Sequence, residues 1–144
     1  MMREIKFRGK GAITNNWFIG SLITFKDGAM IYSDNYLSQG AVKPETIGQY
    51  TGLKDKNGKE IYEGDILVWE QNGVKSNPLV VDFSHGSFGY YYTDNNFYSF
   101  AGNSNFTFNP FDTDIIFEII GNIHDKPEFI KNKKSKLIEN ECNK

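Results

Sequence analysis

The apolar side chains of this chain recur at every second position rather than every third or fourth, and this period constrains the fold more than any other feature. The segment 17–25 shows it best. Its odd positions carry Trp17, Ile19, Ile23 and Phe25. Its even positions carry Phe18, Leu22 and Thr24. Because both faces are largely apolar, we predict a strand that is covered on both sides.

Other short segments share this pattern and are separated by residues that favour turns. Asp27-Gly28, Asn57-Gly58 and Asn72-Gly73 are each expected to form a tight turn, because Gly and Asn tolerate positive φ. Gly9 and Gly11 are expected to end the first strand, and 33–45 reads as an irregular connection. The further strands predicted are 47–50, 65–71, 79–83, 89–93, 97–100, 105–108 and a buried strand at 115–120.

These patterns predict a mainly β fold, a small antiparallel β-barrel or sandwich with a short C-terminal helix. Nothing in the sequence has the 10–15-residue helical segments that βαβ crossovers require. The helix is expected to begin near Pro127. We expect one β domain over 1–130, with a division into sub-lobes 1–50 and 51–130 left open, and a Lys-rich helical or frayed tail over 131–144.

Composition excludes several classes of protein. The chain has 144 residues, 15% of them aromatic, which is too much apolar ring for a disordered chain. No apolar run is long enough to span a membrane, and the N-terminus lacks the apolar core of a secretory signal. The single cysteine, Cys142, cannot form an internal disulfide. These features predict a cytoplasmic protein.

Few residues could carry chemistry. His85 and His124 each have a carboxylate nearby, but no nucleophile is placed beside either, so both read as ordinary loop histidines. Asp112 and Asp114 could share one strand face as a carboxylate pair, although such pairs more often cap a loop. Metal sites usually need three or four ligands. We therefore predict no catalytic site, no cofactor and no metal.

The aromatic residues between 88 and 108 leave two interpretations open. They could stack on bases, as in oligonucleotide-binding barrels. They could instead form a core or a subunit interface. Residues 73–125 carry one Lys and six acidic side chains, which would repel phosphate, so core or interface is favoured.

Three longer stretches have a distinctive sequence. The first is the opening 2–10, the second runs from Pro44-Glu45-Thr46-Ile47-Gly48 through Asn57-Gly58 to Ile66, and the third is 117–128. Together they resemble the YopX family of small bacteriophage and prophage proteins. The resemblance implies a phage or prophage origin in a bacterial cytoplasm and a mainly β, barrel-containing fold. It implies no established activity. The matched positions to which we assign a structural role are Gly58, Gly64, Asp65, Gly121 and Asn122.

The function expected from these observations is that of a phage accessory protein without enzymatic activity, acting by binding. A homo-oligomer is the expected assembly, with an unidentified host or phage protein as partner and no membrane association. Single-stranded nucleic-acid binding by an aromatic β-barrel face and the Lys tail is the alternative.

Overall fold

The computed structural model describes residues 3–33, 38–84, 86–93, 109–110 and 115–128. Their strands form two antiparallel sheets, and each sheet belongs to one of two compact units. The first unit runs to Lys54 and includes Glu60–Tyr62, whereas the second holds Asp55–Lys59 and the chain from Glu63 onward. The prediction of a mainly β fold is confirmed. The strands expected at 97–100 and 105–108, the 131–144 tail and most of the expected helix fall outside the described residues, and Pro127 lies in a turn, so the helix is not confirmed.

Six strands and one 3₁₀ helix make up the first unit. They are β1 (Phe7–Lys10), β2 (Trp17–Phe25), β3 (Gly28–Tyr32), β4 (Gln39–Val42), η1 (Pro44–Thr46), β5 (Gly48–Lys54) and β6 (Glu60–Tyr62). The strand order is β4-β3-β2-β1-β5-β6. β4 lies inside the segment predicted to be irregular, because its residues Gln-Gly-Ala-Val lack the apolar alternation that marks a strand.

The core of this unit lies on one face of β2 only. Phe18 and Leu22 pack against the buried cluster of Ala29, Ile31 and Val42. On the other face Ile19, Ile23 and Phe25 are exposed by 45%, 44% and 57%. The prediction that both faces of this strand are covered is therefore wrong: the even positions alone meet the core.

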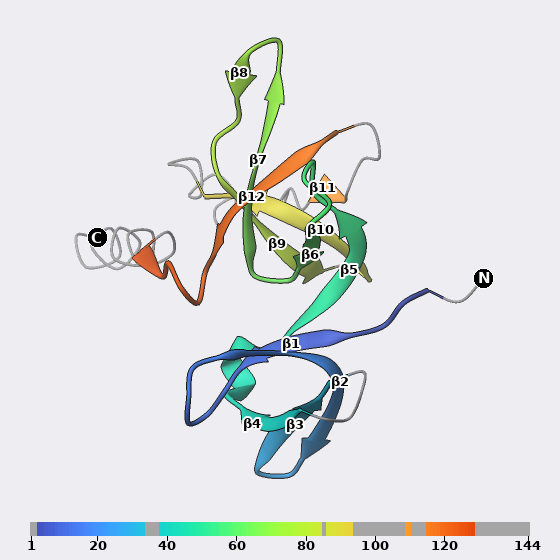
Figure 1. Ribbon diagram of the computed structural model, residues 1–144. Helices are drawn as coiled ribbons and strands as arrows, with labels where there is room; N and C mark the ends of the chain where they lie inside the picture. Colours follow the sequence, from blue (N-terminus) through green and yellow to red (C-terminus); the bar gives the residue numbers. More distant parts are fainter. Residues whose placement is uncertain (1–2, 34–37, 85, 94–108, 111–114, 129–144) are drawn as a thin grey trace, which may run out of the picture. The chain divides into compact units, whose positions relative to one another are not determined.

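Within the first sheet, β1 to β4 curl into the ring of strands seen in Figure 1, which brings the end of β1 close to β4. Gly11, just after β1, forms a single bridge with Val42, and the Lys43 amide donates to the Lys10 carbonyl at 2.8 Å. One bridge does not make a continuous ladder, so the predicted barrel or sandwich is not confirmed by the described strands. Gly9 continues β1 instead of ending it, because it pairs with Phe18 on β2, and a Cβ there would lie 3.0 Å from Val42.

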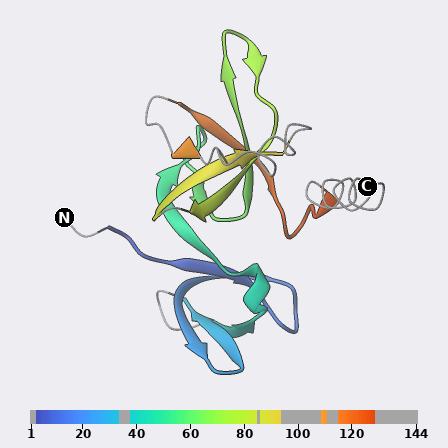
Figure 2. The ribbon, with the colours of Figure 1, turned by 180° about the vertical axis from the view of Figure 1, so that it is seen from behind.

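The second unit holds the remaining strands. They are β7 (Asp65–Gln71), β8 (Val74–Lys75), β9 (Leu79–Ser84), β10 (Ser87–Tyr92), β11 (Asn109–Pro110) and β12 (Phe117–Asn122). The order is β11-β10-β9-β7-β12, and β8 pairs with β7 in a hairpin that projects beyond the sheet (Figure 2). That hairpin turns at Asn72 and Gly73, which have φ values of 54° and 78°, as the sequence predicted.

β7 is buried on both of its faces. Ile66, Leu67 and Val68 are consecutive and buried, and successive side chains of a strand point to opposite faces. β12 differs, because it is the edge strand of this sheet. Its Phe117 is buried against the Tyr90 ring, with 5.6 Å between ring centres, but Ile116 before it is 69% exposed. The run 115–120 is thus a half-buried edge strand rather than the buried strand predicted.

Candidate functional site

Four of the five residues assigned a structural role lie together in the second unit. Asp65 begins β7 and is the register partner of Asn122 at the end of β12, and Gly121 is opposite Ile66. Gly64 precedes Asp65 with φ of +89°, and its carbonyl accepts from the Ile123 amide at 2.9 Å. No local sequence pattern predicts that Gly64–Asp65 lies beside Gly121–Asn122, which is far along the chain. The pairing of β7 with β12 brings the two together.

Asn122 organises the turn that follows β12. Its side-chain oxygen accepts from the amides of His124 and Asp125 at 3.0 and 2.9 Å, and its Nδ2 donates to the Asp125 carboxylate at 2.8 Å. The turn brings the His124 ring against Gly64, where a Cβ would lie 3.3 Å from Nε2. His124 is thus a turn residue that packs against Gly64. The neighbouring Asp125 carboxylate accepts a hydrogen bond from the Asn122 side chain.

Gly58 lies apart from these four, in a turn that docks on the other end of β12. It has φ of +80° and closes the connection between β5 and β6. The Lys56 amide donates to the Phe117 carbonyl at 2.8 Å, and the Lys56 ammonium lies 3.1 Å from the Glu118 carboxylate. The turn therefore occupies part of the outer edge of β12.

Asp55 holds this turn, and the sequence analysis missed it. Oδ1 accepts from the amides of Asn57 and Lys59, both at 2.9 Å, while Oδ2 accepts from the Ile119 amide at 3.1 Å. Burial by itself would raise the pKa of Asp55, but these three amides outweigh it and hold the pKa below its ordinary value. An Asp two residues before Asn-Gly is a signal for an Asx turn and could have identified it.

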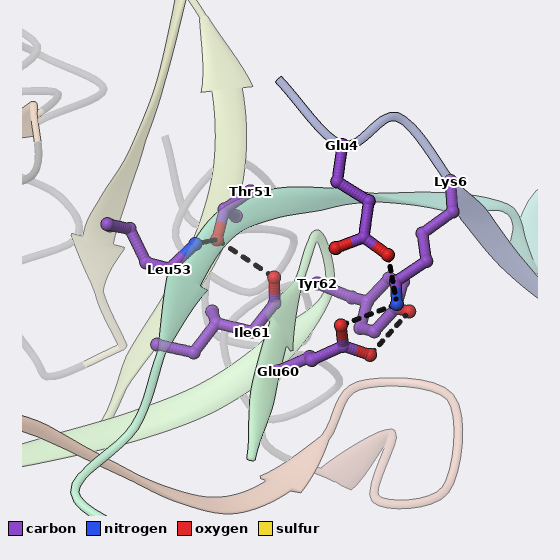
Figure 3. A network of polar contacts seen from close by, with 7 residues as sticks. All are labelled: Glu4, Lys6, Thr51, Leu53, Glu60, Ile61 and Tyr62. Atoms are coloured by element: carbon purple, nitrogen blue, oxygen red, sulfur yellow. Dashed lines mark hydrogen bonds and ion pairs between the residues drawn. The ribbon is translucent and has the colours of Figure 1, made fainter. Parts of the chain in front are cut away.

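The first unit carries a cluster of cations and aromatic rings around β1. Lys6 forms ion pairs with Glu4 at 2.9 Å and Glu60 at 2.5 Å (Figure 3). Its ammonium lies 5.2 Å from the centre of the Tyr50 ring. Burial would lower the pKa of Lys6, but the two carboxylates raise it well above its ordinary value. The hydroxyl of Tyr62 donates to Glu60 at 3.3 Å, and burial raises the pKa of that hydroxyl.

Arg8 is the buried centre of this cation–aromatic cluster. Its guanidinium lies 4.7 Å from the centre of the Trp17 ring and 5.0 Å from that of Tyr62, and the residue is 9% exposed. Lys10 lies over the same Trp17 ring at 5.7 Å. The groups are arranged as a stack that fixes β1, β2 and β6 to one another, and no nucleophile with an adjacent base is among them.

Next to the cluster, the Thr51 hydroxyl forms hydrogen bonds where the pairing of β5 with β6 is irregular. The register shifts between Tyr50 and Lys54. Thr51 bridges this gap, since its hydroxyl donates to the Ile61 carbonyl at 2.9 Å and accepts from the Leu53 amide at 3.1 Å (Figure 3). The polar groups here are used to hold the backbone of the first unit.

The remaining candidates cannot be placed. His85, Asp112, Asp114 and Cys142 lie outside the described residues. Within the described ranges, no three His, Cys, Asp or Glu side chains are grouped so that they could hold a metal ion. Nor does any helix in those ranges have the length and apolar character needed to cross a bilayer.

Comparison with known proteins gives the family and agrees with the fold. The sequence profile of the YopX protein family matches residues 6–131. No curated protein matches the sequence. The crystal structure of protein EF1440 from Enterococcus faecalis is similar in fold, with a TM-score of 0.50 and 23% identity, over 90% of this chain and 99% of that one. Because the family profile covers most of the sequence, including the Asp55 turn and β12, the chain belongs to the YopX family.

Proposed function

We propose that this protein is a phage or prophage accessory protein that acts by binding rather than by catalysis, as a homo-oligomer in the cytoplasm of a bacterial host. One observation carries the proposal. The described polar side chains of Asp55, Asn122 and Lys6 are engaged with other groups of the protein itself, whereas large apolar side chains on β2 are exposed. Such a distribution favours association over chemistry.

The sheet edges indicate that association uses faces rather than edges. Asp55 and Lys56 take up backbone groups of the edge strand β12, and the chain beside β1 bonds to β4 through Ala12 and Lys43. The other two edge strands, β6 and β11, are three and two residues long. Proteins use such devices to prevent strand addition at an edge, so an exposed face is the better candidate for a partner.

Light scattering on the full chain tests the oligomer. We expect a mass that is an integer multiple, two or more, of the 16.5 kDa chain at micromolar concentration. A mass of one chain at high concentration would contradict this part of the proposal. For the partner, a tagged full-length protein expressed in induced host cells should co-purify with a defined protein that reassociates when both are pure.

Single-stranded nucleic acid binding is the second candidate, and the placement of Arg8 and Lys10 over Trp17 favours it. Ring stacking combined with cations is how sequence-tolerant binding of single strands works. Against it, Arg8 is buried and Lys6 is paired with two carboxylates. A titration of single-stranded DNA at rising salt decides the matter, because phosphate contacts make affinity fall steeply with salt.

A further inference from the structure

The residue types on the outward face of β2 follow the same order from either end of the strand. From one end to the other its side chains are Trp17, Ile19, Ser21, Ile23 and Phe25, which is aromatic, isoleucine, serine, isoleucine, aromatic. These are alternate positions, so they lie on one side of the strand, while Phe18 and Leu22 face the core. A binding face for an unrelated partner has no need of such symmetry.

This face is accessible to solvent, and its two isoleucines flank the exposed Ser21 at its centre. Ile19 is 45% and Ile23 44% exposed, and Phe25 is 57% exposed at the end of the strand. Met30 is the register partner of Ile23 on β3, and Ala41 on β4 is the partner of Met30. Directly opposite residues of paired strands share a face, so the apolar area extends across three strands.

We propose that two copies of this chain pack face to face through β2, with their strands antiparallel and a two-fold axis passing between the two Ser21 residues. In a two-fold contact, residue i of one copy meets residue j of the other and the reverse. The axis therefore places Ile19 against Ile23 of the partner subunit and Trp17 against Phe25 of the partner subunit. This proposal rests on the homo-oligomer of the proposed function and specifies the face through which the copies associate.

The charges at the two ends of the strand fit this antiparallel arrangement. At the Trp17 end, Lys10 lies 5.7 Å from the ring centre and Arg8 lies beside it. At the Phe25 end, the turn carries Lys26 and Asp27, whose charges offset each other. The axis brings the cationic Trp17 end toward the neutral Phe25 end of the partner subunit, whereas a parallel arrangement would place the two cationic ends together.

Two opposite charge substitutions test the pairing. Ile19→Glu and Ile23→Lys each place an unpaired charge against an isoleucine twice per dimer. Each should therefore raise the dimer dissociation constant about a hundredfold or more. An equimolar mixture of the two variants should recover association, because the heterodimer has one Glu–Lys contact and one Ile–Ile contact. Analytical ultracentrifugation of the full-length variants, separately and mixed, measures this.

A matched control separates the surface from general effects of charge. Val74→Lys introduces the same charge at a β-branched residue that is 69% exposed on β8, in the other unit. It should leave the dissociation constant unchanged. Circular dichroism and the melting temperature of each variant, taken where all are monomeric, verify that the fold is kept.

The outcomes distinguish this inference from the function on which it rests. Recovery in the mixture alone supports the antiparallel β2 contact. If the wild-type chain associates and neither variant disturbs it, the surface is wrong while the homo-oligomer stands. If the wild-type chain is monomeric at millimolar concentration, both fall. If the wild-type chain is monomeric and a purified host protein binds the Ile23→Lys variant more weakly than the wild type, the face binds a different partner and the self-pairing is overturned.

Discussion

β2 and β7 each run through the middle of a sheet, yet they are buried differently. β7 has three consecutive buried residues, Ile66, Leu67 and Val68, so both of its faces are covered. β2 covers only one face, and Ile19 and Ile23 on the other are nearly half exposed. β7 thus lies in the core on both faces, whereas β2 contacts the core with one face and solvent with the other.

The difference shows which part of a strand pattern carries information about burial. β7 contains the uninterrupted apolar series Ile-Leu-Val-Trp, while Gly20, Ser21 and Thr24 interrupt β2. A chain that is to be covered on both faces excludes small polar residues from both. Ser21, in the middle of the exposed face of β2, is therefore the sequence signal that this face meets solvent, because Gly20 and Thr24 lie on the opposite face.

The largest effect that should separate the two strands is that of truncating their side chains. Leu67→Ala in β7 should lower the free energy of unfolding by about 2–5 kcal/mol, because it leaves a cavity at a residue that is fully buried. Ile23→Ala in β2 should change it by no more than about 0.5 kcal/mol. Urea unfolding at a protein concentration where the chain is monomeric measures both.

An equal loss for the two variants would contradict the comparison, since it would mean that the exposed face of β2 is covered within the monomer. Ile31→Ala is a useful reference in the first unit, because Ile31 on β3 is fully buried. It should resemble Leu67→Ala rather than Ile23→Ala.

Asp55 gives the next largest effect and tests the covered edge of the second sheet. Asp55→Ala removes the acceptor of three backbone amides and should cost about 2 kcal/mol, most of it from the Ile119 amide, because Ile119 is half-buried whereas Asn57 and Lys59 are exposed. Asp55→Asn keeps one acceptor and should cost less. Hydrogen exchange at Ile119 should quicken in both variants.

The same carboxylate should make stability depend on pH in a defined direction. The folded pKa of Asp55 is below its ordinary value of 3.8, so its contribution is complete above that value and is lost as pH falls through the folded pKa. The difference in unfolding free energy between wild type and Asp55→Asn should therefore shrink as pH falls below about 4. A difference that stays constant to pH 2 would assign the effect to geometry rather than charge.

Much of the fold could be predicted from sequence, whereas the clusters could not. The period of two and turns such as Asn72-Gly73 predicted most of the strands, because they depend on local backbone preferences. β4 escaped detection since its residues lack apolar alternation and are held by neighbours on β3. The docking of the Asp55 turn on β12 and the stacking of Arg8 between two rings depend on contacts between distant segments, which no local pattern encodes.

The glycines of the family motifs should show a graded, smaller effect. Gly64→Ala should cost about 1–2 kcal/mol, because φ is +89° and the new Cβ would press on the His124 ring at 3.3 Å. Gly58→Ala should cost about 1 kcal/mol, since its φ is also positive but the space around it is open. Gly121→Ala should cost least, because φ is not positive there and only the flexible Lys126 side chain is near. Thermal unfolding of the three variants gives the order directly.

The smallest effect concerns the ion pair between Lys56 and Glu118, which lies on the same edge as Asp55. The side chains of Lys56 and Glu118 are 45% and 30% exposed, so water screens the pair and Glu118→Gln should cost less than about 1 kcal/mol. That cost should vanish in 1 M salt. The cost of Asp55→Ala should persist there, because hydrogen bonds to buried backbone amides are screened far less. If 1 M salt removed the cost of both substitutions, surface charge alone would hold the turn on β12. The edge of the second sheet would then be open to solvent, as the outward face of β2 is in the first.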